Sequence, residues 1–282
     1  MARPLRIQRV GGWYHLTSRG NERRAIFRAP EDYARFLALL AEVTERYQWR
    51  LHGYVLMANH YHLLVELGDE NLSRALQWLN TSYGQWFNRR HHRVGHLFQG
   101  RFKGILLEEE RWAVEVSRYL HLNPVRVRVL GLDKMGRARQ RVGKGSSAEE
   151  VRERLELLRS YPWSSYLAYV GREPKPAWLT CEWVWRSFGP GRQESQRAYG
   201  RFVEQGAREG EAPEIWGQVK GQVVLGGEEF IERTATEVPA DEVDLHLLAG
   251  LAAVLEKREL VERMIHTTDA RDIVVILSGA CA

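Results

Sequence analysis

The sequence predicts an α+β fold, in which an antiparallel sheet carries helices on one face. Short segments with period-two alternation recur along the N-terminal part of the chain, and they indicate strands. Between them lie longer segments with apolar residues three and four positions apart, which indicate helices. With 44% hydrophobic and 27% charged residues, the chain has the composition of a globular protein.

The first elements are expected in the order strand, helix, strand, strand. Residues 13–17 alternate and predict the first strand. Pro30 opens a helix, because its fixed φ suits a first helical turn. Strands are expected at 50–57 and 60–67, with a tight turn at Ala58-Asn59 between them.

Three further elements complete the pattern. A helix is expected at 72–90 and a strand at 101–108. The next helix starts near residue 110 and ends near Asn123, because Pro124 disfavours the helical conformation of the residue before it. The order βαββα followed by βα is typical of a ferredoxin-like sheet, which would leave the face opposite the helices open.

The tripeptide His60-Tyr61-His62 lies in the third predicted strand. Residues two apart in a strand share a face, so the two imidazoles lie side by side on the predicted open face, where they could hold one metal ion. The tripeptide alone also fits a pair of ordinary half-buried strand histidines.

The helix before Pro124 contains a second candidate group. Tyr119 and Asn123 are four residues apart and therefore neighbours on the helix surface, so the tyrosine hydroxyl could attack a phosphate bound nearby. In the alternative interpretation, Tyr119 flanks the core and Asn123 only caps the helix. His121 is a competing metal ligand, although it lies on a different face of the helix.

Basic residues form two clusters along the chain, and such clusters suit binding to phosphate backbones. The first comprises Arg3, Arg6, Arg9, Arg19, Arg23, Arg24 and Arg28. The second comprises Arg126, Arg128, Lys134, Arg137, Arg139, Arg141 and Lys144. The net charge is only +5, so the distribution of charge is the stronger indication. Each cluster alone would also fit a solvated basic surface.

Cys181 and Cys281 are too few for a disulfide framework or a four-cysteine zinc site. The sequence shows neither an apolar signal segment nor a run of eighteen apolar residues. We therefore expect a cytoplasmic protein that has no membrane partner.

We divide the chain into four segments. A catalytic domain is expected at 1–129, a basic loop and helix that we interpret as an insertion at 130–160, and an aromatic-rich helical continuation at 161–205. Residues 206–282 are expected to form a linker and a C-terminal region of unknown role. Ser147-Ala148-Glu149-Glu150 has the pattern of a capping box and predicts a helix start.

Five motifs resemble those of the REP-associated tyrosine transposases, which are single-tyrosine members of the HUH endonuclease group. They occur in the order of that family within residues 1–205, as Tyr14–Asn21, Tyr54–Leu64, His96–Lys103, Tyr119–Arg126 and Tyr161–Tyr166. The family nicks single-stranded DNA beside palindromic hairpins, with a tyrosine that becomes joined to the 5′ phosphate.

The resemblance implies a role for each candidate residue. Tyr119 would be the nucleophile, His60 and His62 the metal ligands, and Asn123 the third ligand. Imidazoles combined with amide or water oxygens would suit Mg²⁺ or Mn²⁺. We expect single-stranded or hairpin DNA as the partner of a monomer or homodimer, bound by Arg3, Arg6, Arg9, Arg19, Arg23, Arg24, Arg101, Lys103 and Arg126.

Three other functions stay open at this point. The chain could bind hairpin DNA without cutting it, which a nicking assay would reveal. It could be an HUH-type replication initiator, although the sequence shows no recognisable helicase segment. It could also be a metal-dependent hydrolase that uses water, which would form no covalent protein–DNA species.

Overall fold

The computed structural model describes residues 7–126, 147–209, 215–221 and 223–237. The chain divides into two compact units, residues 8–215 and a second unit that comprises residues 1–7 and 216–282. The first unit contains the sheet that positions the candidate site. The described part of the second unit includes β5 (Val224–Leu225) and α9 (Glu228–Glu237), and η4 (Ile215–Gln218) spans the boundary in sequence.

The sheet of the first unit contains the strands β1 (Trp13–Arg19), β2 (Trp49–Met57), β3 (His60–Leu67) and β4 (Lys103–Leu107). They lie in the order β2-β3-β1-β4, and each neighbouring pair is antiparallel. One helix connects β1 to β2 and another connects β3 to β4. This is the ferredoxin-like arrangement, and the predicted α+β class is confirmed.

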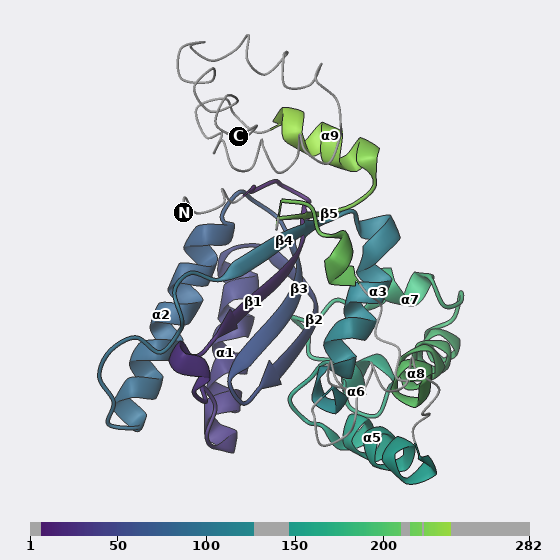
Figure 1. The fold of residues 1–282 in the computed structure, drawn as a ribbon, viewed down its shortest axis with the longest axis horizontal. Coiled ribbons are helices and arrows are strands. Elements are labelled where there is room, and N and C mark those ends of the chain that lie inside the picture. The colour runs from purple at the N-terminus through teal and green to yellow at the C-terminus, as the bar shows by residue number, and fades with distance from the viewer. Residues whose placement is uncertain (1–6, 127–146, 210–214, 222, 238–282) are drawn as a thin grey trace, which may run out of the picture. The chain divides into compact units, whose positions relative to one another are not determined.

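Helices α1 (Pro30–Arg46) and α2 (Leu72–Arg90) cover one face of this sheet (Figure 1). Tyr61 of β3 shows how they pack. Its ring lies 4.8 Å from that of Phe36 in α1, measured between centroids, and its hydroxyl donates to Asn80 Oδ1 of α2 over 2.8 Å. The helix starts predicted at Pro30 and at residue 72 are both confirmed.

Helix α3 (Glu109–Leu122) lies on the opposite face, and this corrects the prediction that helices occupy one face only. Leu120 of α3 lies over Gly53 of β2, where a Cβ atom would be 3.6 Å from its Cδ2. The apolar stripe of α3 has to be buried, and the βαββαβ pattern offers it only the face that α1 and α2 leave uncovered. The predicted open face is therefore partly covered by the helix that carries Tyr119.

The aromatic-rich continuation is helical, as predicted, and packs beside α3. Its helices are α6 (Tyr166–Tyr169), α7 (Glu182–Arg186) and α8 (Arg192–Glu209), and they follow α5 (Ala148–Ser160), the helix expected at the end of the segment 130–160. The capping box at the start of α5 forms, since Ser147 Oγ accepts the Glu150 N–H and the Glu150 carboxylate accepts the Ser147 N–H. Two bonds between Arg159 and Glu204 join α5 to α8.

The chain after the aromatic-rich continuation departs from the expected boundary. Helix α8 continues through Glu209, so the linker expected from Gly206 begins no earlier than the end of that helix. The basic loop expected at 130–146 and the end of the C-terminal region, residues 238–282, lie outside the described residues. Among the helices that the structure describes, none is both long and apolar enough to cross a membrane.

Candidate active site

The register of β1 and β3 brings the first two sequence motifs together. Arg19 lies directly opposite His60, and Thr17 lies directly opposite His62. Because side chains alternate along a strand, His15, Thr17 and Arg19 share one face with the two histidines of β3. This is the face against which α3 packs, so every second residue of the first motif lines the candidate site.

His62 is bonded to His15 in the neighbouring strand. The distance between His15 Nε2 and His62 Nδ1 is 2.8 Å, and the planes of the two rings are 13° apart. Burial lowers the pKa of His15 to about 3. The pKa of His62 lies well below its usual value because of burial and then the nearby His15, His60 and Arg126. Both imidazoles are therefore neutral near pH 7.

His60 is bonded to the residue before it in the β2–β3 turn. Its Nδ1 lies 2.7 Å from Asn59 Oδ1, and Asn59 Nδ2 donates to the carbonyl of Arg23. That second bond fixes the orientation of the amide, so Asn59 Oδ1 can only accept and His60 Nδ1 must donate. The Nε2 atom of neutral His60 then carries the lone pair. Burial, followed by Arg19, lowers the pKa of His60 to about 4.

The predicted turn at Ala58-Asn59 is confirmed, and the chain segment that follows β1 holds it in place. The carbonyl of Asn59 accepts the N–H of Gly20, and the carbonyl of Ala58 accepts the N–H groups of Ile26 and Phe27. The strand that carries the two histidines therefore begins at a turn that the segment after β1 holds by hydrogen bonds.

Tyr119 is brought to the same patch by α3. Its ring lies edge-on to those of His62 and His15, at centroid distances of 5.7 and 5.9 Å. The ring of His60 is 4.9 Å from that of His62 and nearly perpendicular to it. The guanidinium carbon of Arg126 lies 4.6 Å from the centre of the Tyr119 ring. His60, His62 and Tyr119, which the sequence suggested separately, are thus neighbours in space.

Asn123 follows the last residue of α3 and opens η2 (Asn123–Val125). Its Nδ2 donates to the carbonyl of Tyr119 over 2.9 Å, so it does act as a helix cap. The capping bond uses the amide nitrogen, and the amide oxygen is the atom that a hard cation would bind.

His121 is removed from the site, contrary to its prediction as a competing ligand. It is fully buried, with Nδ1 2.6 Å from the hydroxyl of Tyr199 and Nε2 2.8 Å from that of Ser165. Both ring nitrogens are thereby engaged between α3 and the helical extension. His121 holds α3 in position and has no ring nitrogen left for a metal ion.

The last motif, Tyr161–Tyr166, acts on the same helix through β2. The hydroxyl of Tyr161 donates to the carbonyl of Leu56, and the N–H of Leu56 donates to the carbonyl of Trp163. Ser165 Oγ accepts the N–H of Tyr54 while it also contacts His121. The motif therefore extends the edge of the sheet and fixes the helix that carries Tyr119.

The predicted DNA-binding cations lie at different distances from the histidines. Lys103 is opposite Thr17 in the register and exposed on the same face. Arg19 is exposed, and Gln99 accepts a bond from its Nε over 2.7 Å. Arg23 and Arg24 follow in η1 (Asn21–Arg23) and directly after it, and Arg101 precedes β4.

Arg9 is at the other end of the sheet. It is close to Gly11 in sequence, and the N–H of Gly11 bonds to the carbonyl of Leu67, the last residue of β3. His60 is the first residue of that strand, so Arg9 lies about 20 Å or more from the histidines at the usual rise of a strand. Arg3 and Arg6 lie outside the described residues.

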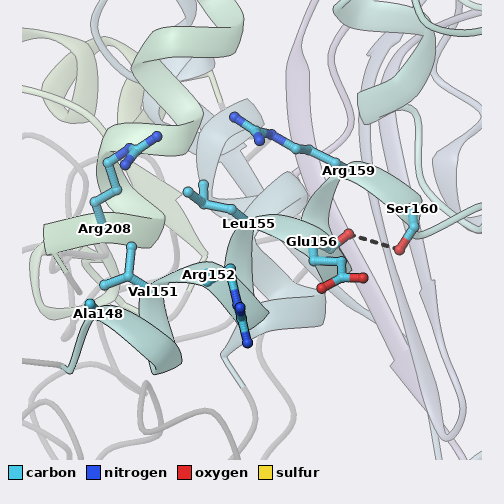
Figure 2. A pocket seen from close by; sticks show the side chains of 8 residues that line it. All are labelled: Ala148, Val151, Arg152, Leu155, Glu156, Arg159, Ser160 and Arg208. Atoms are coloured by element: carbon cyan, nitrogen blue, oxygen red, sulfur yellow. Dashed lines mark hydrogen bonds between the residues drawn. The ribbon is translucent and has the colours of Figure 1, made fainter.

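A hollow of about 680 Å³ lies elsewhere, along α5 (Figure 2). Ala148, Val151 and Leu155 give it an apolar lining, and the guanidinium groups of Arg159 and Arg208 border it. The lining contains neither histidine nor cysteine. None of the residues that we predicted to carry chemistry or bind metal takes part in this hollow.

Sequence reasoning missed His15 and Asn59 as parts of the site. Both stand in the quoted motifs, and the strand alternation that groups His60 with His62 also applies to His15, Thr17 and Arg19. What the sequence lacked was the register of β1 against β3, which decides which residues of the two strands face each other.

Part of the chain is similar to known proteins. Residues 9–123 match the family described as "Transposase IS200 like". No curated protein matches the chain significantly. A REP-associated tyrosine transposase solved with a REP hairpin is similar with 16% identity over 62% of this chain and 89% of its own, at a TM-score of 0.44. A candidate transposase from Deinococcus radiodurans R1 is 14% identical over 41% and 92% of the two chains, at a TM-score of 0.30.

Both TM-scores lie below 0.5, so the family assignment depends on the sequence match. That match spans β1 to α3 and therefore covers His60, His62 and Tyr119 together with the sheet that positions them. Residues 9–123 of the chain are thus similar to the IS200-like transposases, in agreement with the resemblance predicted from the motifs.

Proposed function

We propose that the protein is a metal-dependent endonuclease and strand transferase, which cuts single-stranded DNA beside hairpin-forming repeats through a 5′-phosphotyrosine intermediate. The observation that supports this function is the convergence of His60, His62 and Tyr119. They come from a strand and a helix that are distant in sequence. The centre of the His62 ring nevertheless lies 4.9 Å from that of His60 and 5.7 Å from that of Tyr119.

The donor atoms fit a single hard divalent ion. His60 and His62 would offer their Nε2 atoms and Asn123 its amide oxygen, with water or phosphate oxygens completing the shell. Among the described residues there is no cluster of three or more His, Cys, Asp and Glu side chains that could hold a metal ion. This mixed donor set suits Mg²⁺ or Mn²⁺ better than a closed zinc site. Bound there, the ion would neutralise charge on a non-bridging oxygen of the scissile phosphate.

Tyr119 would carry out the covalent step. Its hydroxyl oxygen attacks the phosphorus and loses its proton, while the bond from phosphorus to the 3′ oxygen breaks and that oxygen takes up a proton. The products are a 5′-phosphotyrosine and a free 3′ hydroxyl. Because the phosphodiester bond is exchanged and not hydrolysed, a second 3′ hydroxyl can reverse the step and join strands without ATP. Arg126, which lies over the ring, would favour the negative charge that develops on the phenol oxygen.

The substrate would be held mainly through its phosphates. Lys103 and Arg19 are exposed on the face that carries the histidines, so a strand laid across β4, β1 and β3 would meet both cations on its way to Tyr119. A flexible unpaired strand can bring its phosphate in line with a nucleophile on α3 more readily than a duplex can. The paired stem of the hairpin would then mark the site that the protein recognises, and the protein would contact it through its phosphate backbone.

A covalent-adduct assay tests the proposal. A labelled hairpin with a single-stranded foot is incubated with the full chain and Mg²⁺ or Mn²⁺, and protein-linked DNA is resolved on a denaturing gel. We expect an adduct with the natural chain, and none with Tyr119→Phe or after EDTA treatment. Tyr61→Phe is the matched control, because its hydroxyl bonds to Asn80 on the opposite face of the strand that carries the histidines. This variant should form the adduct.

Other outcomes would favour the alternatives. An adduct formed by Tyr119→Phe would contradict the nucleophile assignment. Nicking by the natural chain without any adduct would favour a hydrolase that uses water. Hairpin binding without nicking, at any metal concentration, would favour a binding protein that has no catalytic activity.

A further inference from the structure

His15 is in direct contact with His62, one of the candidate ligands. Its Nε2 lies 2.8 Å from His62 Nδ1, the planes of the two rings are nearly parallel, and only 3% and 7% of the two residues are exposed. The contact joins β1 to β3 across the register that also pairs Thr17 with His62. The position of His15 is thus set by backbone pairing and not by a flexible side chain.

Two neutral imidazoles that share one hydrogen bond need one proton between the two facing nitrogens, so two arrangements are possible. If His15 Nε2 carries the proton, His62 is protonated on Nε2 and has no lone pair to offer on that side. If His62 Nδ1 carries the proton, His62 Nε2 keeps its lone pair and His15 is protonated on Nδ1. Only the second arrangement is compatible with a metal ion on His62 Nε2.

We propose that His15 is a positioning residue that accepts the His62 Nδ1 proton and so fixes the tautomer and ring orientation in which His62 binds the metal ion. The inference rests on the proposed function, because it requires a metal ion at His60 and His62.

The tautomer of His60, the other proposed ligand, is fixed in the same way by Asn59. Asn59 Oδ1 holds the Nδ1 proton of His60, and the bond from Asn59 to the Arg23 carbonyl fixes its direction. Both ligand histidines would therefore present Nε2, one through an amide and one through a second imidazole. Partners of this kind typically change metal affinity by about 10- to 100-fold.

Metal binding by the full chain without DNA tests the inference directly. Free Mn²⁺ is followed by electron paramagnetic resonance as protein is titrated in. His15→Phe keeps a ring for Tyr119 to pack on but cannot accept a proton, and we expect its Mn²⁺ affinity to fall by about 10-fold or more. His15→Gln retains an acceptor and should recover most of that loss.

His52→Phe is the matched control. His52 is a buried histidine of the same sheet, and it bonds to Glu66 and to the Thr180 carbonyl near the other end of β3. This variant should lower the melting temperature and leave Mn²⁺ affinity within about twofold of the natural chain, as expected for a residue distant from the first ligand shell. If His15→Phe and His52→Phe lower Mn²⁺ affinity equally, His15 has only a structural role.

Failure of the inference can be separated from failure of the proposed function. If His62→Ala abolishes Mn²⁺ binding while His15→Phe binds normally, the metal site stands and the role of His15 is overturned. If the natural chain and His62→Ala bind Mn²⁺ alike, the metal site itself is wrong and the inference falls with it. Nitrogen-15 spectra of the Mg²⁺ form provide a second readout, in which His62 should be protonated on Nδ1. Protonation on Nε2 would overturn the inference.

Discussion

The guanidinium carbon of Arg126 lies 4.6 Å from the centre of the Tyr119 ring, one turn beyond the end of the helix that carries the tyrosine. A cation over a phenol ring favours negative charge on that ring and its oxygen. The contact therefore connects the last residue of the fourth motif, Tyr119–Arg126, to the proposed nucleophile.

We expect Arg126→Ala to reduce the rate of adduct formation by about 10-fold or more, since removal of one electrostatic stabiliser commonly costs at least that much. Arg126→Lys should recover part of the rate. Arg111→Ala is the matched control, because Arg111 lies over the ring of Trp112 on the same helix in a comparable contact. Single-turnover cleavage rates measure the effect. A slower rate in the Arg111 variant, or an unchanged rate in Arg126→Ala, would rule out the proposed role.

Asn59→Ala should weaken metal binding and cleavage together. Without the amide oxygen that accepts its proton, His60 is free to change tautomer and orientation, and the expected loss of Mn²⁺ affinity is about 10-fold. Asn80→Ala is the control, because it removes one side-chain acceptor on the opposite face of the same strand. Calorimetric titration with Mn²⁺ compares the two variants. Equal affinities would show that Asn59 serves only the turn.

The fold should lose stability in acid because of its buried histidines. Burial lowers the pKa of His121 to about 3, whereas an unfolded histidine titrates near 6.5. Below that upper value the unfolded chain binds a proton that the folded chain excludes. The free energy of unfolding should therefore fall by up to about 1.4 kcal/mol per pH unit for this group, until the pH reaches about 3.

Urea unfolding between pH 7 and pH 4 measures this dependence. His121→Gln should reduce the slope by up to one proton, although it also lowers stability at pH 7 through its lost bonds to Tyr199 and Ser165. Equal slopes for His121→Gln and the natural chain would contradict the assignment.

Salt dependence should distinguish the cations near the site from those far from it. Lys103→Ala and Arg19→Ala should each reduce the log–log slope of affinity against salt by about 0.7 for a short single strand. Arg9→Ala should change it less, since Arg9 lies beyond the opposite end of β3. Fluorescence anisotropy over a range of salt concentrations gives the slopes. A larger change in slope for Arg9→Ala than for Lys103→Ala would show that the DNA strand does not cross the face that carries the histidines.

Much of the central fold could be predicted because its patterns are local. The bounds of β3 and α2 are those expected from alternation and helical spacing, and Pro30 begins α1. The strand expected at 101–108 is shorter, at Lys103–Leu107, because only these residues pair with β1. Local pattern decides the type of an element, whereas pairing decides its length.

The placement of α3 could not be predicted in this way. It depends on His121, whose partners Tyr199 and Ser165 are 78 and 44 residues away in sequence. The spacing of Tyr119 and Asn123 showed that they are neighbours, but only this long-range anchoring decides which sheet face they meet. The pairing of His15 with His62 was hidden for the same reason, since it spans 47 residues.

The alternation of side chains along β1 links the candidate site to the core. His15, Thr17 and Arg19 face the site, while Tyr14, Leu16 and Ser18 face the helical core on the other side. A slip of one residue would exchange the two sets completely, so it would bury a charged guanidinium and expose a tyrosine and a leucine. A chain with this misaligned strand would therefore lose its packed core and its candidate site together. The register that buries the core is thus also the register that assembles the candidate site.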